Sequence, residues 1–132
     1  MARDDAPSTK PLLDKLGVKA GHRVSVLGID EPDFARQLLE RDADVRLGHR
    51  RARADLMFVG MDRREDLPRL HTHRDFIAKD GAIWVVWPKG SKAINENDVR
   101  DAALEAGLVD VKVVSFSPTY SALKLIYRLA DR

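Results

Sequence analysis

Asp30, Asp62 and Lys89 each stand just beyond an apolar run that has the length of a β-strand, and they are the first candidates for chemistry. Gly28 and Trp87 stand at the ends of two of these runs. If the runs form parallel strands, their carboxyl ends meet at one edge of the sheet, where open α/β proteins bind ligands. The five residues would then form a patch for a small polar ligand, with Asp62 able to act as a general base.

A purely structural interpretation of the same residues stands beside this one. Asp30 would cap the helix that follows it, and Asp62 would start the next helix. Lys89 would neutralise both carboxylates. We therefore predict a ligand-binding patch at most, and we assign no catalytic residue.

Other residues that could bind a metal ion or a phosphate group form less specific patterns. His71 and His73 are two positions apart in a predicted helix, so their side chains point about 200° apart and cannot share a metal ion. We therefore expect no metal site. The run Pro88–Lys92 lacks the spacing of a phosphate-binding loop. Because the chain has no cysteine, disulfides and thiolate chemistry are excluded.

Short apolar runs alternate with amphipathic ones from Lys10 onward, which predicts strands joined by crossover helices. The expected strands are Arg23–Gly28, Asp44–Leu47, Ala54–Gly60, Gly81–Pro88, Leu108–Phe116 and Ser121–Leu129. The expected helices are Pro11–Leu16, Glu31–Arg41, Asp66–Lys79 and a segment that Asn95 caps and Gly107 ends. The fold class is therefore α/β, a three-layer sandwich with a mainly parallel sheet and a C-terminal antiparallel hairpin.

One link in this pattern is too short for a crossover helix. Only the six residues Gly48–Arg53 separate the second and third strands. An extended segment of this length spans roughly 20 Å, enough to return along the sheet. Part of one face should therefore lack a helix, and we expect that uncovered face to mediate self-association or the binding of another protein.

The formal net charge of +2 conceals an uneven distribution. Residues 46–74 hold 8 arginines and 4 acidic residues, whereas residues 93–110 hold 1 arginine and 5 acidic residues. Such charge runs are typical of solvated loops, and head-to-tail association is the alternative that their opposite signs allow. The basic stripe lacks the interleaved aromatic residues and the motifs of nucleic-acid binding, so we expect no nucleic-acid partner.

The length of the chain and its lack of long apolar runs indicate how many domains it forms and where it is located. Its 132 residues are enough for one domain, which we place at residues 10–132 after a flexible tail over residues 1–9. No apolar run approaches the length of a membrane span, and no signal peptide is recognisable. We therefore expect no membrane partner and a cytoplasmic location.

The order of the elements, with ADLMFVG and IAKDGAIWVVWPKG as the central strands, resembles a shortened Rossmann-like scaffold of S-adenosylmethionine-dependent methyltransferases. More narrowly, PLLDKLGVKAG, GAIWVVWPKG, GLVDVKV and TYSALKL are similar to a bacterial family of small proteins of unknown function. The resemblance implies a methyltransferase-like topology that includes the terminal hairpin. It does not imply an activity.

Two motifs of the methyltransferase scaffold are missing. The GxGxG turn after the first strand is replaced by Gly28-Ile29-Asp30-Glu31-Pro32, and the second strand does not end in the acidic residue that would hold a ribose. We therefore expect no cofactor and disfavour S-adenosylmethionine. The sequence favours a non-catalytic domain that acts by self-association or protein binding. The alternative is a small-ligand-binding protein or enzyme that uses Asp30, Asp62 and Lys89.

Overall fold

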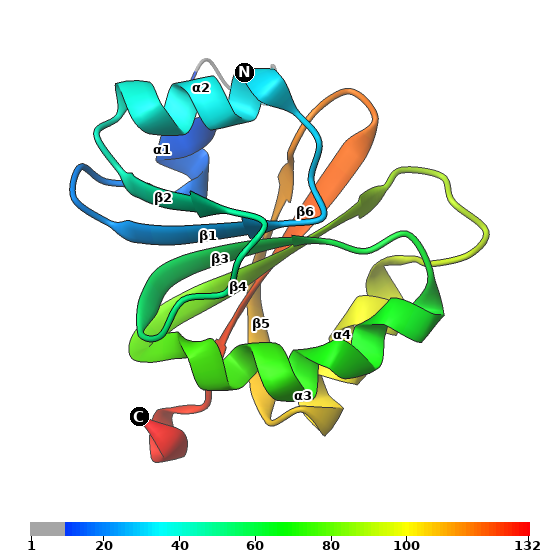
Figure 1. Ribbon diagram of the computed structural model, residues 1–132. Helices are drawn as coiled ribbons and strands as arrows, with labels where there is room; N and C mark the ends of the chain where they lie inside the picture. Colours follow the sequence, from blue (N-terminus) through cyan, green and yellow to red (C-terminus); the bar gives the residue numbers. More distant parts are fainter. Residues whose placement is uncertain (1–9) are drawn as a thin grey trace.

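Six strands form one sheet in the computed structural model, which describes residues 10–132 (Figure 1). The tail predicted over residues 1–9 lies outside the described part. The strands run in the order β2-β1-β3-β4-β6-β5. The first four are parallel, and β6 pairs antiparallel with both β4 and β5. Their bounds are β1 Arg23–Leu27, β2 Asp44–Leu47, β3 Ala54–Gly60, β4 Ile77–Pro88, β5 Leu108–Ser115 and β6 Tyr120–Tyr127. The predicted fold class is confirmed.

Helices cover both faces of this sheet, which gives the three layers (Figure 1). The helix α1 (Leu12–Leu16) and the helix α2 (Pro32–Glu40) lie on one face, over a core that includes Phe34 and Phe58. The helix α3 (Leu70–His73) and the helix α4 (Glu96–Glu105) lie on the other face, over a core that includes Met57 and Val99. Three 3-10 helices complete the elements: η1 Arg64–Arg69, η2 Arg74–Phe76 and η3 Leu129–Asp131. No helix within residues 10–132 is long and apolar enough to cross a membrane.

The segment predicted as one helix over residues 66–79 is shorter and less regular than expected. It consists of η1, the single turn α3 and η2, and β4 begins at Ile77. Pro68 lies inside η1, where it lacks the amide hydrogen that a regular α-helix would use. The register between β3 and β4 shifts near Ala54, and a Cβ on Gly81 would lie 2.7 Å from the carbonyl oxygen of Ala54. A side chain at position 81 would therefore collide with the backbone of β3, so β4 needs glycine there.

The link of residues 48–53 contains no helix, as its length predicted. Its Arg51 side chain folds back onto the edge strand β2. There it donates hydrogen bonds to the backbone oxygen of Asp44 at 2.8 Å and to the carboxylate of Asp44 at 2.9 Å. The link is thus held against β2, and it leaves the neighbouring sheet face without a helix.

The basic and acidic segments of the chain meet within one molecule. The guanidinium of Arg64 lies 2.9 Å from the carboxylate of Asp98, which ties η1 to α4. Asp98 also completes the predicted capping arrangement at the start of α4. Its amide donates to the side chain of Asn95, and its carboxylate accepts from the Asn95 amide, each at 3.0 Å. Part of the opposed charge is therefore neutralised internally.

Candidate functional site

The carboxyl ends of β1 and β3 come into close backbone contact where Gly28 follows β1 and Gly60 ends β3. A Cβ on Gly60 would lie 2.2 Å from the carbonyl oxygen of Gly28. Gly28 itself has a φ of 68°, a conformation that side chains disfavour. Cavities open on both sides of this contact, and both glycines line them.

The first cavity, which we call the acidic pocket, has a volume of about 200 Å³. Three of the five predicted site residues, Gly28, Asp30 and Asp62, line it. The other side chains that line it come from the face of the sheet that carries α1 and α2, or from the loop before α2. They are Ile29, Glu31, Val86, Phe116 and Tyr120. Three acidic residues and one tyrosine are therefore among the residues that line this pocket.

The other two predicted site residues do not line the acidic pocket. Trp87 is only 5% exposed and packs in the core beneath α3 and α4, on the opposite face. The amine of Lys89 donates to the hydroxyl of Ser115 at 2.6 Å. No ion pair joins Lys89 to Asp30 or Asp62 in the part of the chain that the structure describes. The pocket thus keeps its carboxylates without the predicted neutralising lysine.

The start of α2 differs from the prediction that Asp30 is its N-cap. Glu31 occupies that position, and its side chain makes no capping hydrogen bond. Pro32 is the first helical residue and has no amide hydrogen. The amides of Phe34 and Ala35 both donate to the carbonyl oxygen of Glu31, at 3.0 and 3.2 Å. The turn therefore presents carboxylates where a helix start usually presents free amides.

Asp33 adds a further negative charge in the first turn of α2. Hydrogen bonds from Arg36 and Gln37 hold the pKa of this carboxyl below its usual value. Asp33 is therefore ionised at neutral pH. Its charge is balanced by the ion pair with Arg36. The carboxylates near this end of the helix that form no ion pair among residues 10–132 are those of Asp30 and Glu31.

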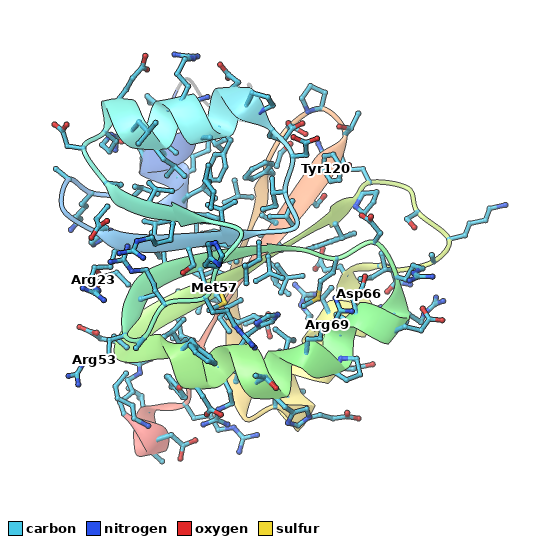
Figure 2. The ribbon with its side chains drawn as sticks, in the orientation of Figure 1. Arg23, Arg53, Met57, Asp66, Arg69 and Tyr120 are labelled. Carbon is cyan, nitrogen blue, oxygen red and sulfur yellow. The ribbon has the colours of Figure 1, made fainter. Side chains whose placement is uncertain are left out.

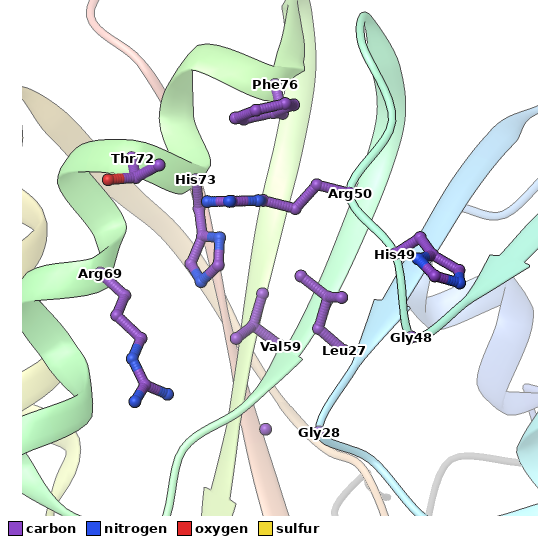
Figure 3. Close-up of a pocket in the computed structure, with 11 residues that line it drawn as sticks. Leu27, Gly28, Gly48, His49, Arg50, Val59, Arg69, Thr72, His73 and Phe76 are labelled. Atoms are coloured by element: carbon purple, nitrogen blue, oxygen red, sulfur yellow. The ribbon is translucent and has the colours of Figure 1, made fainter.

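The second cavity, which we call the basic hollow, has a volume of about 730 Å³ and lies beside the link of residues 48–53 (Figure 3). Its polar side chains are His49 and Arg50 from the link, Arg69 from η1, and Thr72 and His73 from α3. Its other lining residues are Leu27, Gly28, Gly48, Val59, Gly60 and Phe76. None of the lining residues is acidic. Figure 2 shows Arg69 and Tyr120 on opposite sides of the sheet, so the two cavities face different layers.

Buried His73 is the central polar group of the basic hollow. Its ring lies between Arg50 and Arg69 (Figure 3), it is 7% exposed, and its Nδ1 has no hydrogen-bond partner. Burial, together with the charges of Arg50 and Arg69, lowers the pKa of His73 to about 4. The imidazole is therefore neutral at pH 7.

Residues 10–132 contain no group of three or more His, Asp or Glu side chains that could hold a metal ion. His71 is exposed, whereas His73 is buried, as expected for neighbours that do not share a face. The sequence reasoning missed the role of His73 in lining a cavity. The short link of residues 48–53 was the available signal, because it predicted an uncovered face at this place.

Several solved structures that share this fold are described as methyltransferases. A putative methyltransferase from Thermoplasma acidophilum matches with a TM-score of 0.66 at 8% identity, over 92% of this chain and 76% of that chain. A putative type 11 methyltransferase from Sulfolobus solfataricus matches with a TM-score of 0.65 at 12% identity, over 92% of each chain. A TehB-like methyltransferase from Corynebacterium glutamicum, described as SAM-dependent, gives a TM-score of 0.57 at 13% identity, over 89% of this chain and 85% of that chain.

Identities this low establish a shared fold and not a shared activity. No curated protein matches the chain. One family matches residues 13–129, and it is described as "Protein of unknown function (DUF3052)". Since this match covers most of the chain and the fold is shared with methyltransferases, the protein belongs to the DUF3052 family of unknown function and is built on a methyltransferase-like scaffold.

Proposed function

We propose that this protein is a non-catalytic, methyltransferase-like domain that has lost the glycine-rich cofactor loop and acts by binding. The observation that carries the proposal is the start of α2, where Asp30 and Glu31 form no ion pair among residues 10–132 and Pro32 has no amide hydrogen. S-adenosylmethionine carries a carboxylate that needs free amides or cations. This turn offers mainly anions, so electrostatic repulsion opposes binding.

The end of β2 supports the same conclusion. The chain continues there through Leu47, Gly48 and His49, and none of these residues accepts hydrogen bonds from ribose hydroxyls as a carboxylate does. Asp44, the acidic residue of β2, lies at the opposite end of the strand and is bound by Arg51. The residues present therefore do not fit S-adenosylmethionine.

Calorimetric titration with S-adenosylmethionine and with its demethylated product tests this proposal. We expect no binding heat and no thermal stabilisation from either compound. The absence is informative because a ligand at about 100 times its Kd would stabilise the fold by about 2.7 kcal/mol. A dissociation constant in the low micromolar range would contradict the loss of cofactor binding.

Self-association is the mode of action that the charge distribution supports. Leu47 is 55% exposed on edge strand β2, next to the exposed Arg46. On α4, Asp101 and Glu105 are exposed and form no ion pair among residues 10–132. A two-fold contact would place the same arginines of two copies against each other. We therefore propose a head-to-tail contact between β2 of one copy and α4 of the next.

Light scattering over a range of protein and salt concentrations tests this contact. We expect more than one subunit at low salt and weaker association at high salt, because the contact joins opposite charges. Leu47→Asp should reduce the association. The matched control is Leu129→Asp, since Leu129 is 79% exposed on η3, away from β2. A strict monomer at high protein concentration would remove the self-association proposal.

The acidic pocket supports a second candidate function, the binding of a small organic cation. Asp30, Glu31 and Asp62 line it, and no cationic side chain is in the lining. The ring of Tyr120 offers a π-face to a cation. This candidate keeps the predicted ligand patch but removes Lys89 and Trp87 from it.

A thermal-shift screen with putrescine and choline as probes distinguishes this candidate. We expect a stabilisation that Asp62→Asn reduces. Asp101→Asn changes the net charge equally at an exposed position outside the pocket, so it should have no effect. If neither probe stabilises the wild-type protein, the acidic pocket is not a site for organic cations.

A further inference from the structure

We propose that the basic hollow binds the phosphate group of a small phosphorylated ligand through Arg50, Arg69 and His73. This inference goes beyond the proposed function and does not depend on it. It concerns a cavity on the face opposite the acidic pocket, and it would stand whether or not S-adenosylmethionine binds.

The positive charge of the basic hollow is not balanced by its own lining. The link of residues 48–53 provides Arg50, and η1 provides Arg69, whereas no aspartate or glutamate lines the cavity. Arg50 forms no ion pair with a carboxylate in the described part of the chain. Arg69 has only a distant partner, Asp66, at 3.6 Å. Both guanidinium groups can therefore bind an added anion.

Arg50 is positioned before any ligand arrives. Its guanidinium carbon lies 4.6 Å from the centre of the Phe76 ring, so the planar group stacks on η2. A guanidinium held in this way loses less side-chain entropy on binding and can donate two parallel hydrogen bonds to an oxyanion.

His73 lines the hollow and carries a buried polar atom without a partner. The side chain is 93% shielded, since only 7% is exposed, and its Nδ1 has no hydrogen-bond partner. Buried polar atoms are rarely left unpaired, and a bound ion is one of the accepted explanations. Figure 3 shows the imidazole between Arg50 and Arg69. Two guanidinium groups and one imidazole match the three oxygens of a phosphate monoester better than the two oxygens of a carboxylate.

The size and backbone of the hollow fit a ligand larger than phosphate alone. Its volume of about 730 Å³ is in the range of small-molecule sites. Gly28, Gly48 and Gly60 line it without side chains, so a ligand can approach the backbone closely. Phe76 is the one aromatic ring of the lining apart from the two histidines, and Arg50 covers it. The hollow therefore lacks a platform on which successive bases of a nucleic acid would stack.

Calorimetric titrations with inorganic phosphate, pyrophosphate and ADP test the inference. We expect at least one probe to bind. Arg50→Gln and Arg69→Gln should each weaken that binding by about tenfold, because each removes a charged hydrogen-bond donor. Arg63→Gln is the matched control: it removes the same charge from an exposed residue that does not line the hollow. We expect less than a twofold effect from it.

Proton NMR of the histidines locates the binding independently of affinity. An anion beside His73 should raise its pKa, so its ring signals should shift on addition of the probe while those of exposed His71 stay unchanged. Failure of all three probes at millimolar concentration would overturn the inference. Equal losses in Arg63→Gln and Arg50→Gln would also overturn it, as would tighter binding of single-stranded RNA with the same dependence on Arg50.

Discussion

At the scale of single residues, the environment of a side chain decides its chemistry more than its type does. His71 and His73 are two positions apart on α3, yet one is exposed and the other is buried between two arginines. No carboxylate lines the basic hollow around His73 to favour its protonated form. The groups that face it are Arg50 from the link, Arg69 from η1 and the ring of Phe76 from η2. Protonation of His73 is therefore opposed by both burial and charge.

This environment predicts a pH-dependent stability. The pKa of His73 falls from 6.5 to about 4 on folding, so the unfolded chain binds more protons between these values. Stability is then complete above pH 6.5 and decreases as the pH falls toward 4. We expect a loss of about 1 to 2 kcal/mol between about pH 7 and about pH 5, discounted because the hollow is open to solvent.

Urea unfolding at the two pH values measures this loss. His73→Gln should remove this part of the pH dependence, whereas His71→Gln should retain it. Identical pH dependence in the wild type and His73→Gln would show that the pKa of His73 does not change on folding.

Gly60 carries a second prediction at the same scale. Gly60→Ala would bring a Cβ to 2.2 Å from the carbonyl oxygen of Gly28, and backbone atoms cannot move aside as a flexible side chain can. We expect a destabilisation of about 3 kcal/mol, the range of severe steric substitutions. Gly90→Ala is the control, since its Cβ would meet open space and only its φ of 69° is unfavourable. Equal destabilisation by both substitutions would contradict the close contact.

At the scale of elements, periodicity predicted the sheet because each strand is an apolar run of suitable length. The helix over residues 66–79 could not be predicted accurately, since its apolar spacing fits an α-helix while Pro68 and the pairing of Ile77 with Ala54 shorten it. Lys79 and Asp80 also looked like the polar end of a helix, although they lie in β4.

The candidate site was predicted only in part, because strand order can be inferred from the sequence but side-chain contacts between distant elements cannot. Parallel strands bring Gly28, Asp30 and Asp62 to one edge whatever the details of packing. Trp87 lies at the same edge, but the alternation of side chains along β4 turns it into the opposite core, while Val86 faces the acidic pocket. Lys89 depends on a contact with Ser115 of β5, which no local pattern reveals.

The capping arrangement at the start of α4 gives a prediction at this scale. Asn95→Ala removes the side-chain oxygen that accepts from the Asp98 amide at 3.0 Å. We expect a loss of about 1 kcal/mol in the free energy of unfolding. Asn97→Ala is the control, because Asn97 is exposed in the first turn of the same helix and makes no capping hydrogen bond there. This substitution should change the free energy of unfolding little. Thermal or urea unfolding measures both, and an unchanged stability in Asn95→Ala would mean that water replaces the cap without loss.

At the scale of the whole molecule, two apolar cores share one sheet, and the two tryptophans of the chain divide between them. Trp84 is fully buried beneath α1, where its indole donates to the carbonyl oxygen of Leu16 at 3.1 Å. Trp87 is buried beneath the other layer. Because β4 carries both side chains, neither core can lose its packing without disturbing the strand that supports the other.

This shared strand predicts a single cooperative unfolding transition. In Trp87→Phe, fluorescence reports only Trp84 and its core, and in Trp84→Phe it reports only Trp87. Within each variant, we expect the fluorescence midpoint in urea to coincide with the far-ultraviolet circular dichroism midpoint. Trp84→Phe should be the less stable variant, since it leaves the carbonyl oxygen of Leu16 without its buried donor, a loss of about 1 to 3 kcal/mol. If the midpoints separate in either variant, that layer unfolds independently, and the uncovered sheet beside the basic hollow marks the place where the two layers uncouple.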